Sequence, residues 1–162
     1  VMALMVKNRP YAAYRERSPV VSQWIHVLRA ATTTPQSTSG AIFTVSGGMI
    51  LVKALIGAVT VAIGAGTTPD LRVNVNPTTG TTYIVASDVV IASDEVGTLY
   101  GVEGDGTAVI AVSSGVATAA LGQGFAVDIG DIEQEHSESV AGQIEWHLWY
   151  QPLEEGGVVV SA

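Results

Sequence analysis

The 162-residue sequence contains no cysteine. Disulfide bonds, zinc-thiolate sites and thiol nucleophiles are therefore excluded, and any stability beyond that of a packed core has to come from association. Charged residues are also scarce, at 14% of the chain against about 25% in a typical soluble domain. Part of the surface is therefore expected to be covered by other protein in the working state. Aromatic residues make up only 6%, so the core must be built from small and β-branched side chains.

Charge is divided unevenly along the chain. Residues 1–40 hold five basic residues against one acidic residue, a net charge of +4, whereas residues 41–162 hold two basic residues against fourteen acidic ones, a net charge of −12. A basic arm on an acidic body predicts that the arm docks on an acidic surface, such as that of a neighbouring copy. The charge of the body opposes nucleic-acid binding, and nucleic acid is not expected as a partner.

The chain divides by composition into a basic arm and linker, residues 1–40, and a body, residues 41–162. Three prolines and a polar stretch over 32–40 make the first part irregular. Within it, the spacing of apolar residues after Pro19 predicts a short helix over 18–30. A disordered tail is the alternative for the whole arm.

The body shows short apolar runs separated by glycine, aspartate, asparagine and threonine about every ten residues. This pattern predicts an all-β fold, either an antiparallel β-sandwich or a jelly-roll-like barrel, with the arm as an extended and partly irregular addition. In the clearest expected strand, 143–151, the even-numbered residues from Ile144 to Tyr150 share one face, and Glu145, His147 and Trp149 share the other. The other expected strands are 71–75, 81–85, 98–102, 108–112, 116–121 and 125–129, with a tight turn at 76–80.

The apolar segment 49–63 has three interpretations. It is too short for a membrane span and carries Lys53 in its middle, so no membrane partner is expected. A helix is disfavoured by its β-branched residues and by Gly57. The segment is therefore expected to form two buried strands, or one long strand with Gly57 as its bend.

The acidic stretch 128–138 is the strongest candidate for chemistry. In a strand, Asp131, Glu133 and Glu135 would line one face, as oxygen ligands of a hard cation such as calcium would. The stretch lacks the glycine and the ligand order of a calcium loop. A solvated face that prevents unwanted strand pairing is the favoured interpretation, and an intersubunit contact for the basic arm is a third. The sequence is thus assigned no metal site.

Signatures of catalysis and of cofactor binding are absent from the sequence. No Gly-x-Ser-x-Gly turn accompanies the three histidines, as a serine hydrolase would require. The glycine-rich stretch 101–106 carries two acidic residues where a phosphate would sit. We therefore expect no enzyme activity, no catalytic residue and no cofactor.

Four segments, 41–57, 76–80, 94–100 and 144–153, resemble head decoration (cement) proteins of tailed bacteriophages in their hydrophobic spacing and turn residues. The resemblance implies a β-rich virion structural protein, made in the host cytoplasm, that sits on the capsid exterior as a homotrimer. Its expected partners are its own copies and the major capsid protein or another virion protein. The family presents no functional motif that would transfer to particular residues.

Tryptophan, tyrosine and arginine dominate the energetics of protein interfaces, which predicts the anchors of such a subunit. The predicted interface residues are Arg9, Tyr11, Tyr14, Arg15, Arg17, Trp24 and Trp149. Two alternatives remain open at this point. One is a tail or fibre-tip component that binds a receptor, and the other is a glycan hydrolase with a carboxylate pair drawn from Glu133, Glu135 and Glu138.

Overall fold

The fold is seen in a computed structural model, which describes residues 23–33, 39–102, 110–112 and 124–162. These residues form strands and connecting loops, with no helix among them. The strands are β1 (Ile25–Thr33), β2 (Gly40–Ser46), β3 (Ile50–Val61), β4 (Asp70–Pro77), β5 (Tyr83–Val90), β6 (Leu99–Val102), β7 (Ile110–Val112), β8 (Phe125–Val127), β9 (Gly130–His136), β10 (Gln143–Pro152) and β11 (Val158–Ser161).

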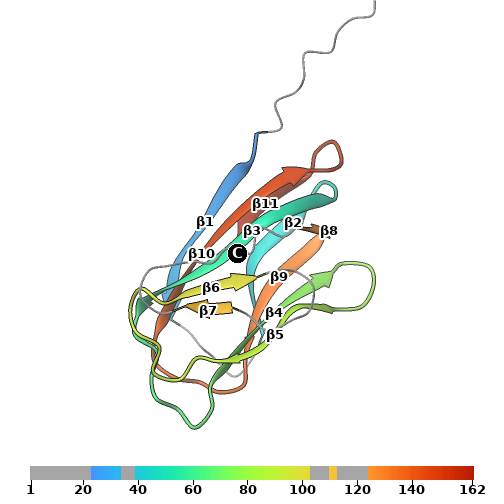
Figure 1. Cartoon of the computed structure of the whole chain (residues 1–162). Coiled ribbons are helices and arrows are strands. Elements are labelled where there is room, and N and C mark those ends of the chain that lie inside the picture. Colours follow the sequence, from blue (N-terminus) through green and yellow to red (C-terminus); the bar gives the residue numbers. More distant parts are fainter. Residues whose placement is uncertain (1–22, 34–38, 103–109, 113–123) are drawn as a thin grey trace, which may run out of the picture.

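The strands form two antiparallel sheets that pack face to face as a β-sandwich (Figure 1). Sheet A has the order β1-β10-β3-β6-β7, with β8 also paired to β3, and sheet B has the order β11-β2-β9-β4-β5. The predicted all-β class is therefore confirmed, and of the two predicted architectures the chain adopts the sandwich.

The core lies between the two sheets and follows the alternation of the sequence. In β10, Ile144, Trp146, Leu148 and Tyr150 are all buried, as predicted. A register shift in β2 lets two consecutive residues, Ile42 and Phe43, both become fully buried.

Two hydrogen bonds tie the aromatic residues of the core to sheet B. The indole Nε1 of Trp146 donates to Oε1 of Gln134 at 2.9 Å, and both side chains are buried. The hydroxyl of Tyr150 accepts a bond of 3.3 Å from the backbone N–H of Val159. Both bonds lie between the two sheets and provide hydrogen-bond partners for polar groups that are buried from water.

The apolar segment 49–63 contains one continuous strand, β3, which confirms the strand interpretation over the helical one. Gly57 provides room within this strand, because a Cβ atom there would meet the Trp146 indole ring at 3.0 Å. The absence of a side chain at position 57 thus leaves room for Trp146, the largest fully buried side chain.

The described part of the chain contains no helix with the length and hydropathy needed to cross a membrane.

The helix predicted over 18–30 is wrong for its described part, because β1 occupies Ile25–Thr33. The spacing of Trp24, Val27 and Leu28 suits a helix, but β1 pairs along its length with β10, starting with Ile25 opposite Tyr150. Tertiary pairing has therefore overridden the local pattern. The part of the predicted arm that the structure describes is thus largely a strand of sheet A.

The remaining strand predictions hold where the structure describes the chain. The turn at 76–80 connects β4 to β5, which pair in antiparallel fashion. Expected strands at 98–102, 108–112 and 125–129 correspond to β6, β7 and β8. The expected strand at 116–121 lies outside the described residues.

Candidate interaction surface

Strand pairing determines which residues lie on the outer face of sheet A, the surface that points away from sheet B. Trp146 and Leu148 of β10 are fully buried, so His147 and Trp149, which alternate with them, point outward. Directly opposite residues on neighbouring strands share a face. The outer face therefore carries His26 and Leu28 of β1, Glu145, His147 and Trp149 of β10, and Ala54, Ile56 and Ala58 of β3. Ala30 lies at the register shift of β1 and is also exposed.

Three aromatic rings from β1 and β10 form a stacked patch on this face. The ring of His26 lies 4.6 Å from that of Trp149, with an angle of 24° between the planes. His147 lies 5.4 Å from His26 and 5.9 Å from Trp149, again nearly parallel to both. Rigid ring systems lose little conformational entropy when a partner docks on them. We call these three residues the ring patch.

The hydrogen bonds of the ring patch determine where its protons lie. Oε1 of Glu145 accepts a bond of 3.0 Å from Nε2 of His147, because an ionised carboxylate has no proton to donate. Nδ1 of His147 is then an acceptor, and Nε2 of His26 donates to it at 3.2 Å.

The same chain of groups differs from a catalytic triad. In a triad, a histidine oriented by a carboxylate activates a hydroxyl or thiol nucleophile. Here the place that the nucleophile takes in a triad is occupied by the imidazole of His26. The arrangement links β1 to β10, and Trp149 stacks on both imidazoles.

The outer face of sheet B is polar, and the row Asp131, Glu133 and Glu135 runs along it in β9. The sequence correctly predicted that these three carboxylates share a face, since the residues between them are buried. Donors on the neighbouring strands satisfy them: Thr44 donates to Asp131 at 2.7 Å, and Asn76 donates to Glu133 at 3.1 Å. We call these three carboxylates the acidic row.

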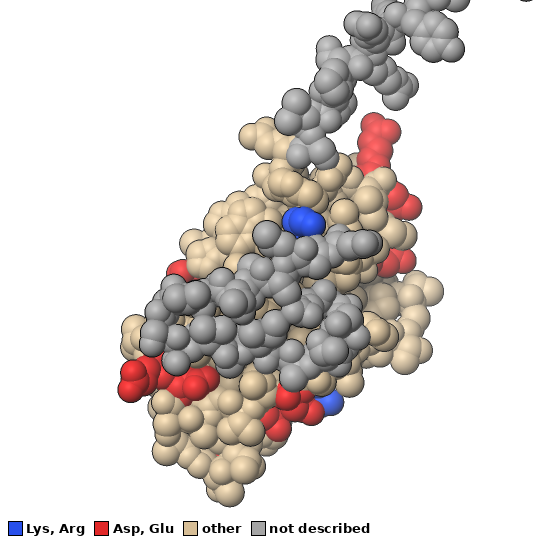
Figure 2. Space-filling model, viewed as in Figure 1, with Lys and Arg blue, Asp and Glu red and all other residues tan. Residues whose placement is uncertain are grey.

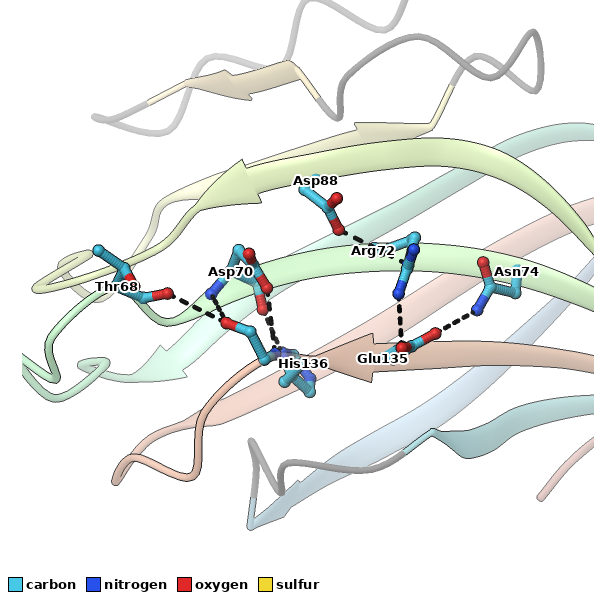
Figure 3. Close-up of polar contacts among 8 residues, drawn as sticks. Thr68, Asp70, Arg72, Asn74, Asp88, Glu135 and His136 are labelled. Carbon is cyan, nitrogen blue, oxygen red and sulfur yellow. Dashed lines mark hydrogen bonds and ion pairs between the residues drawn. The ribbon is translucent and has the colours of Figure 1, made fainter.

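Glu135 takes part in a ladder of side chains that crosses three strands (Figure 3). Arg72 of β4 donates to Glu135 on one side and lies 3.6 Å from the carboxylate of Asp88 in β5 on the other. Asn74 adds a bond of 2.8 Å to the second oxygen of Glu135. Within the described ranges no group of three or more histidine, aspartate or glutamate side chains has the arrangement of a metal site. The acidic row is thus paired within its own sheet.

Beside this ladder, a polar cluster fastens the loop before β4 to the end of β9 (Figure 3). The hydroxyl of Ser137 donates to the carbonyl of Thr68 at 3.0 Å, and its backbone N–H donates to the carboxylate of Asp70 at 3.0 Å. The carboxylate of Glu138 accepts backbone bonds from Thr67 and Thr68, which lower the pKa of Glu138. These contacts join the start of β4 and the loop before it to the residues that follow β9.

His136 is the one histidine that faces the core. Its Nδ1 lies 3.1 Å from the carbonyl of Asp70, so this nitrogen carries the proton and Nε2 is an acceptor in a buried position. Burial lowers the pKa of His136 to about 4, although the bond to Asp70 partly opposes this shift. His136 is therefore neutral near pH 7.

The predicted interface residues fall into two groups. Arg9, Tyr11, Tyr14, Arg15 and Arg17 lie outside the described residues. Trp24 and Trp149 are described: Trp24 is 40% exposed just before β1, and Trp149 belongs to the ring patch. Both tryptophans therefore lie on or directly before the two strands that carry the ring patch.

Two residues of this surface were missed by the sequence reasoning, namely His26 and Leu28. The predicted helix hid the period-two alternation of β1, which places His26, Leu28 and Ala30 on one face. Leu28 is 46% exposed there, opposite His147.

Most of the described surface on the side shown in Figure 2 is uncharged, and acidic side chains lie mainly toward its rim.

Comparison with protein-family models, with curated proteins and with solved structures finds no match for this chain.

Proposed function

We propose that this chain is a non-enzymatic structural subunit that associates with its own copies and with a larger protein assembly. The observation that carries this proposal is the outer face of sheet A, where the ring patch adjoins Leu28, Ile56 and small alanines. Aromatic anchors surrounded by apolar side chains are typical of the centres of protein interfaces.

The distribution of satisfied polar groups supports the same proposal. The acidic row has donors on neighbouring strands, so that face is stable in contact with water. Covering the outer face of sheet A contributes more binding free energy than covering that of sheet B, since each Å² of apolar surface removed from water contributes roughly 25 cal/mol. Partner binding through sheet A therefore leaves the polar face of sheet B in solvent.

We propose further that the assembly is a tailed-bacteriophage virion and that the chain decorates the exterior of its head. This setting rests on the resemblance of segments 41–57, 76–80, 94–100 and 144–153 to decoration proteins. A subunit of that kind needs a rigid body and an adhesive face and has no use for a catalytic centre. A contact with the major capsid protein would then be made through the ring patch and its apolar surroundings.

Electron microscopy with a labelled antibody against the chain tests the virion assignment. Virions of the bacteriophage that encodes the chain should carry label over the head. Label over the tail, or particles without label, would contradict the proposal of a head decoration protein. Particles reconstituted with Trp149→Ala should carry less label than particles with Asp88→Asn, which alters the opposite face.

A further inference from the structure

Strand β1 forms an edge of sheet A as far as the structure describes the chain. Among the described strands, β10 is its one neighbour in the sheet. An edge strand presents unpaired backbone N–H and C=O groups, which accept another extended chain unless the edge is guarded. Outward charges, short length and irregular pairing are the usual guards.

The two edges of sheet B carry such guards. In β5, Asp88 is 54% exposed and bound to Arg72, and the pairing of β5 with β4 shifts register twice. Strand β11 is four residues long and follows Glu154 and Glu155 closely. The other edge of sheet A, β7, is three residues long. Length, charge or register thus protects each of these edges.

Strand β1 is nine residues long and has no outward charge, and its pairing with β10 is regular from Ile25 to Arg29, with one register shift between Arg29 and Thr32. Its single charged residue, Arg29, stands opposite the buried Trp146 and so lies on the core side of the strand. Its outward residues are His26, Leu28 and Ala30. No acidic residue occurs between Gln23 and Thr33, whereas the whole chain has a net charge of −8. Two copies can therefore meet at β1 without bringing carboxylates of this segment together.

We infer that β1 pairs in antiparallel fashion with β1 of a second copy, so that sheet A continues from one subunit into the next about a two-fold axis. A strand paired antiparallel with its own copy is self-complementary, as a two-fold interface requires. The order of residues along β1 fits this arrangement. Large apolar side chains come first, at Trp24 and Ile25, and small ones follow at Ala30 and Ala31, so with an axis near Leu28 the large groups of one copy lie beside the small groups of the other.

This inference rests on the proposed self-association and makes it specific. Trp24 and Ile25 are 40% and 41% exposed in the single chain, and pairing would cover both. It would also place the two ring patches on one continuous outer face. The assembly would then be built from pairs, in place of the trimer that the family resemblance implies.

The absence of cysteine makes a direct test possible, because a single introduced cysteine has no partner except in another copy. Single cysteines at each of positions 26–30, oxidised mildly in the full-length protein, should cross-link most strongly at one position. Opposite residues in an antiparallel pair have Cα atoms about 4.5–5.5 Å apart, which suits a disulfide. In a self-paired strand only the residue on the axis lies opposite itself. Val90→Cys, on the edge strand β5, is the matched control.

A sharp maximum within 26–30, with Val90→Cys remaining monomeric on a non-reducing gel, supports the inference. Uniform cross-linking along β1, or equal cross-linking at Val90, would overturn it. Light scattering of the unmodified protein tests self-association separately from the pairing of β1 with β1. A stable oligomer without a β1 maximum overturns the pairing alone, whereas a monomer at every concentration overturns self-association as well.

A charge placed on the edge provides the second measurement. Leu28→Lys should at least halve the dimeric fraction in sedimentation velocity, because an axis near Leu28 brings the two lysines side by side on the outer face. Val90→Lys, at a residue 60% exposed on β5, should leave that fraction unchanged. Circular dichroism that matches the unmodified protein identifies folded samples. A folded Leu28→Lys variant that remains fully dimeric would contradict the pairing.

Discussion

The two outer faces of the sandwich are built from the same kind of antiparallel strand, yet they differ in how their side chains are satisfied. On sheet B, carboxylates alternate with asparagine, threonine and arginine partners, and Asp131, Glu133 and Glu135 are all hydrogen-bonded within the sheet. On sheet A, rings stack on one another beside aliphatic side chains. The polar face is satisfied in contact with water, and the ring-bearing face is the one that we propose binds protein.

The shared core should show the largest effect, because a change there weakens both faces together. Trp146→Phe removes the N–H that bonds to buried Gln134 and leaves space beside Gly57. We expect the free energy of unfolding to fall by about 3 kcal/mol. Trp149→Phe, on the outer face, should cost less than about 1 kcal/mol. Urea denaturation measures both, and equal losses would contradict the assignment of the two tryptophans to core and surface.

Acidification should weaken the fold through His136, on the core side of sheet B. The pKa of His136 is about 4 when folded, against 6.5 in the unfolded chain, so between these values only the unfolded state takes up the proton. The free energy of unfolding therefore falls as the pH is lowered from 6.5 to 4, by up to about 3 kcal/mol. His136→Asn should have a shallower pH dependence over this window. Parallel curves for the two proteins would rule out this role of His136.

Gly57 tests how closely the core side of sheet A is packed. Gly57→Ala brings a methyl group to 3.0 Å from Trp146, whose indole is held in place by Gln134. We expect a loss of about 2 kcal/mol in thermal or urea unfolding. Gly40→Ala, where a Cβ meets nothing within 4 Å, is the control and should change stability little. A loss at Gly40 that equals the loss at Gly57 would contradict the packing explanation.

The exposed ladder on sheet B should show the smallest effect. Asp88→Asn removes an ion pair of 3.6 Å whose members are both partly exposed. Such pairs contribute less than about 1 kcal/mol, and we expect a change below about 0.5 kcal/mol that disappears in high salt. A loss above 1 kcal/mol in urea denaturation would show that the polar face contributes more to stability than its exposure suggests.

Much of the sandwich could be predicted because alternation is a local signal. Apolar and polar residues alternate from Gln143 to Leu148 in β10, and the burial of Ile144 and Trp146 followed from this pattern. The shared face of Asp131, Glu133 and Glu135 followed in the same way. Their alternation also implied that Gln134 and His136 point inward, although polar residues there gave no hint of their partners, Trp146 and Asp70.

The ring patch could not be predicted from local pattern, because it depends on strand pairing over long separations. His26 and His147 are 121 residues apart in sequence and meet only because β1 pairs with β10. The spacing of Trp24, Val27 and Leu28 predicted a helix where the structure has strand β1. When a strand is stabilised by pairing with a neighbour far away in the sequence, its own residues give only a weak signal for strand structure.

Hydrogen exchange tests most directly the central claim that sheet A associates and the outer face of sheet B does not. The protein is compared at a concentration where it is associated and after strong dilution. The account predicts that backbone amides of Ile25–Thr33 exchange more slowly in the associated sample, while those of β5 exchange at the same rate in both. Slower exchange in β5 with no change in β1 would contradict it.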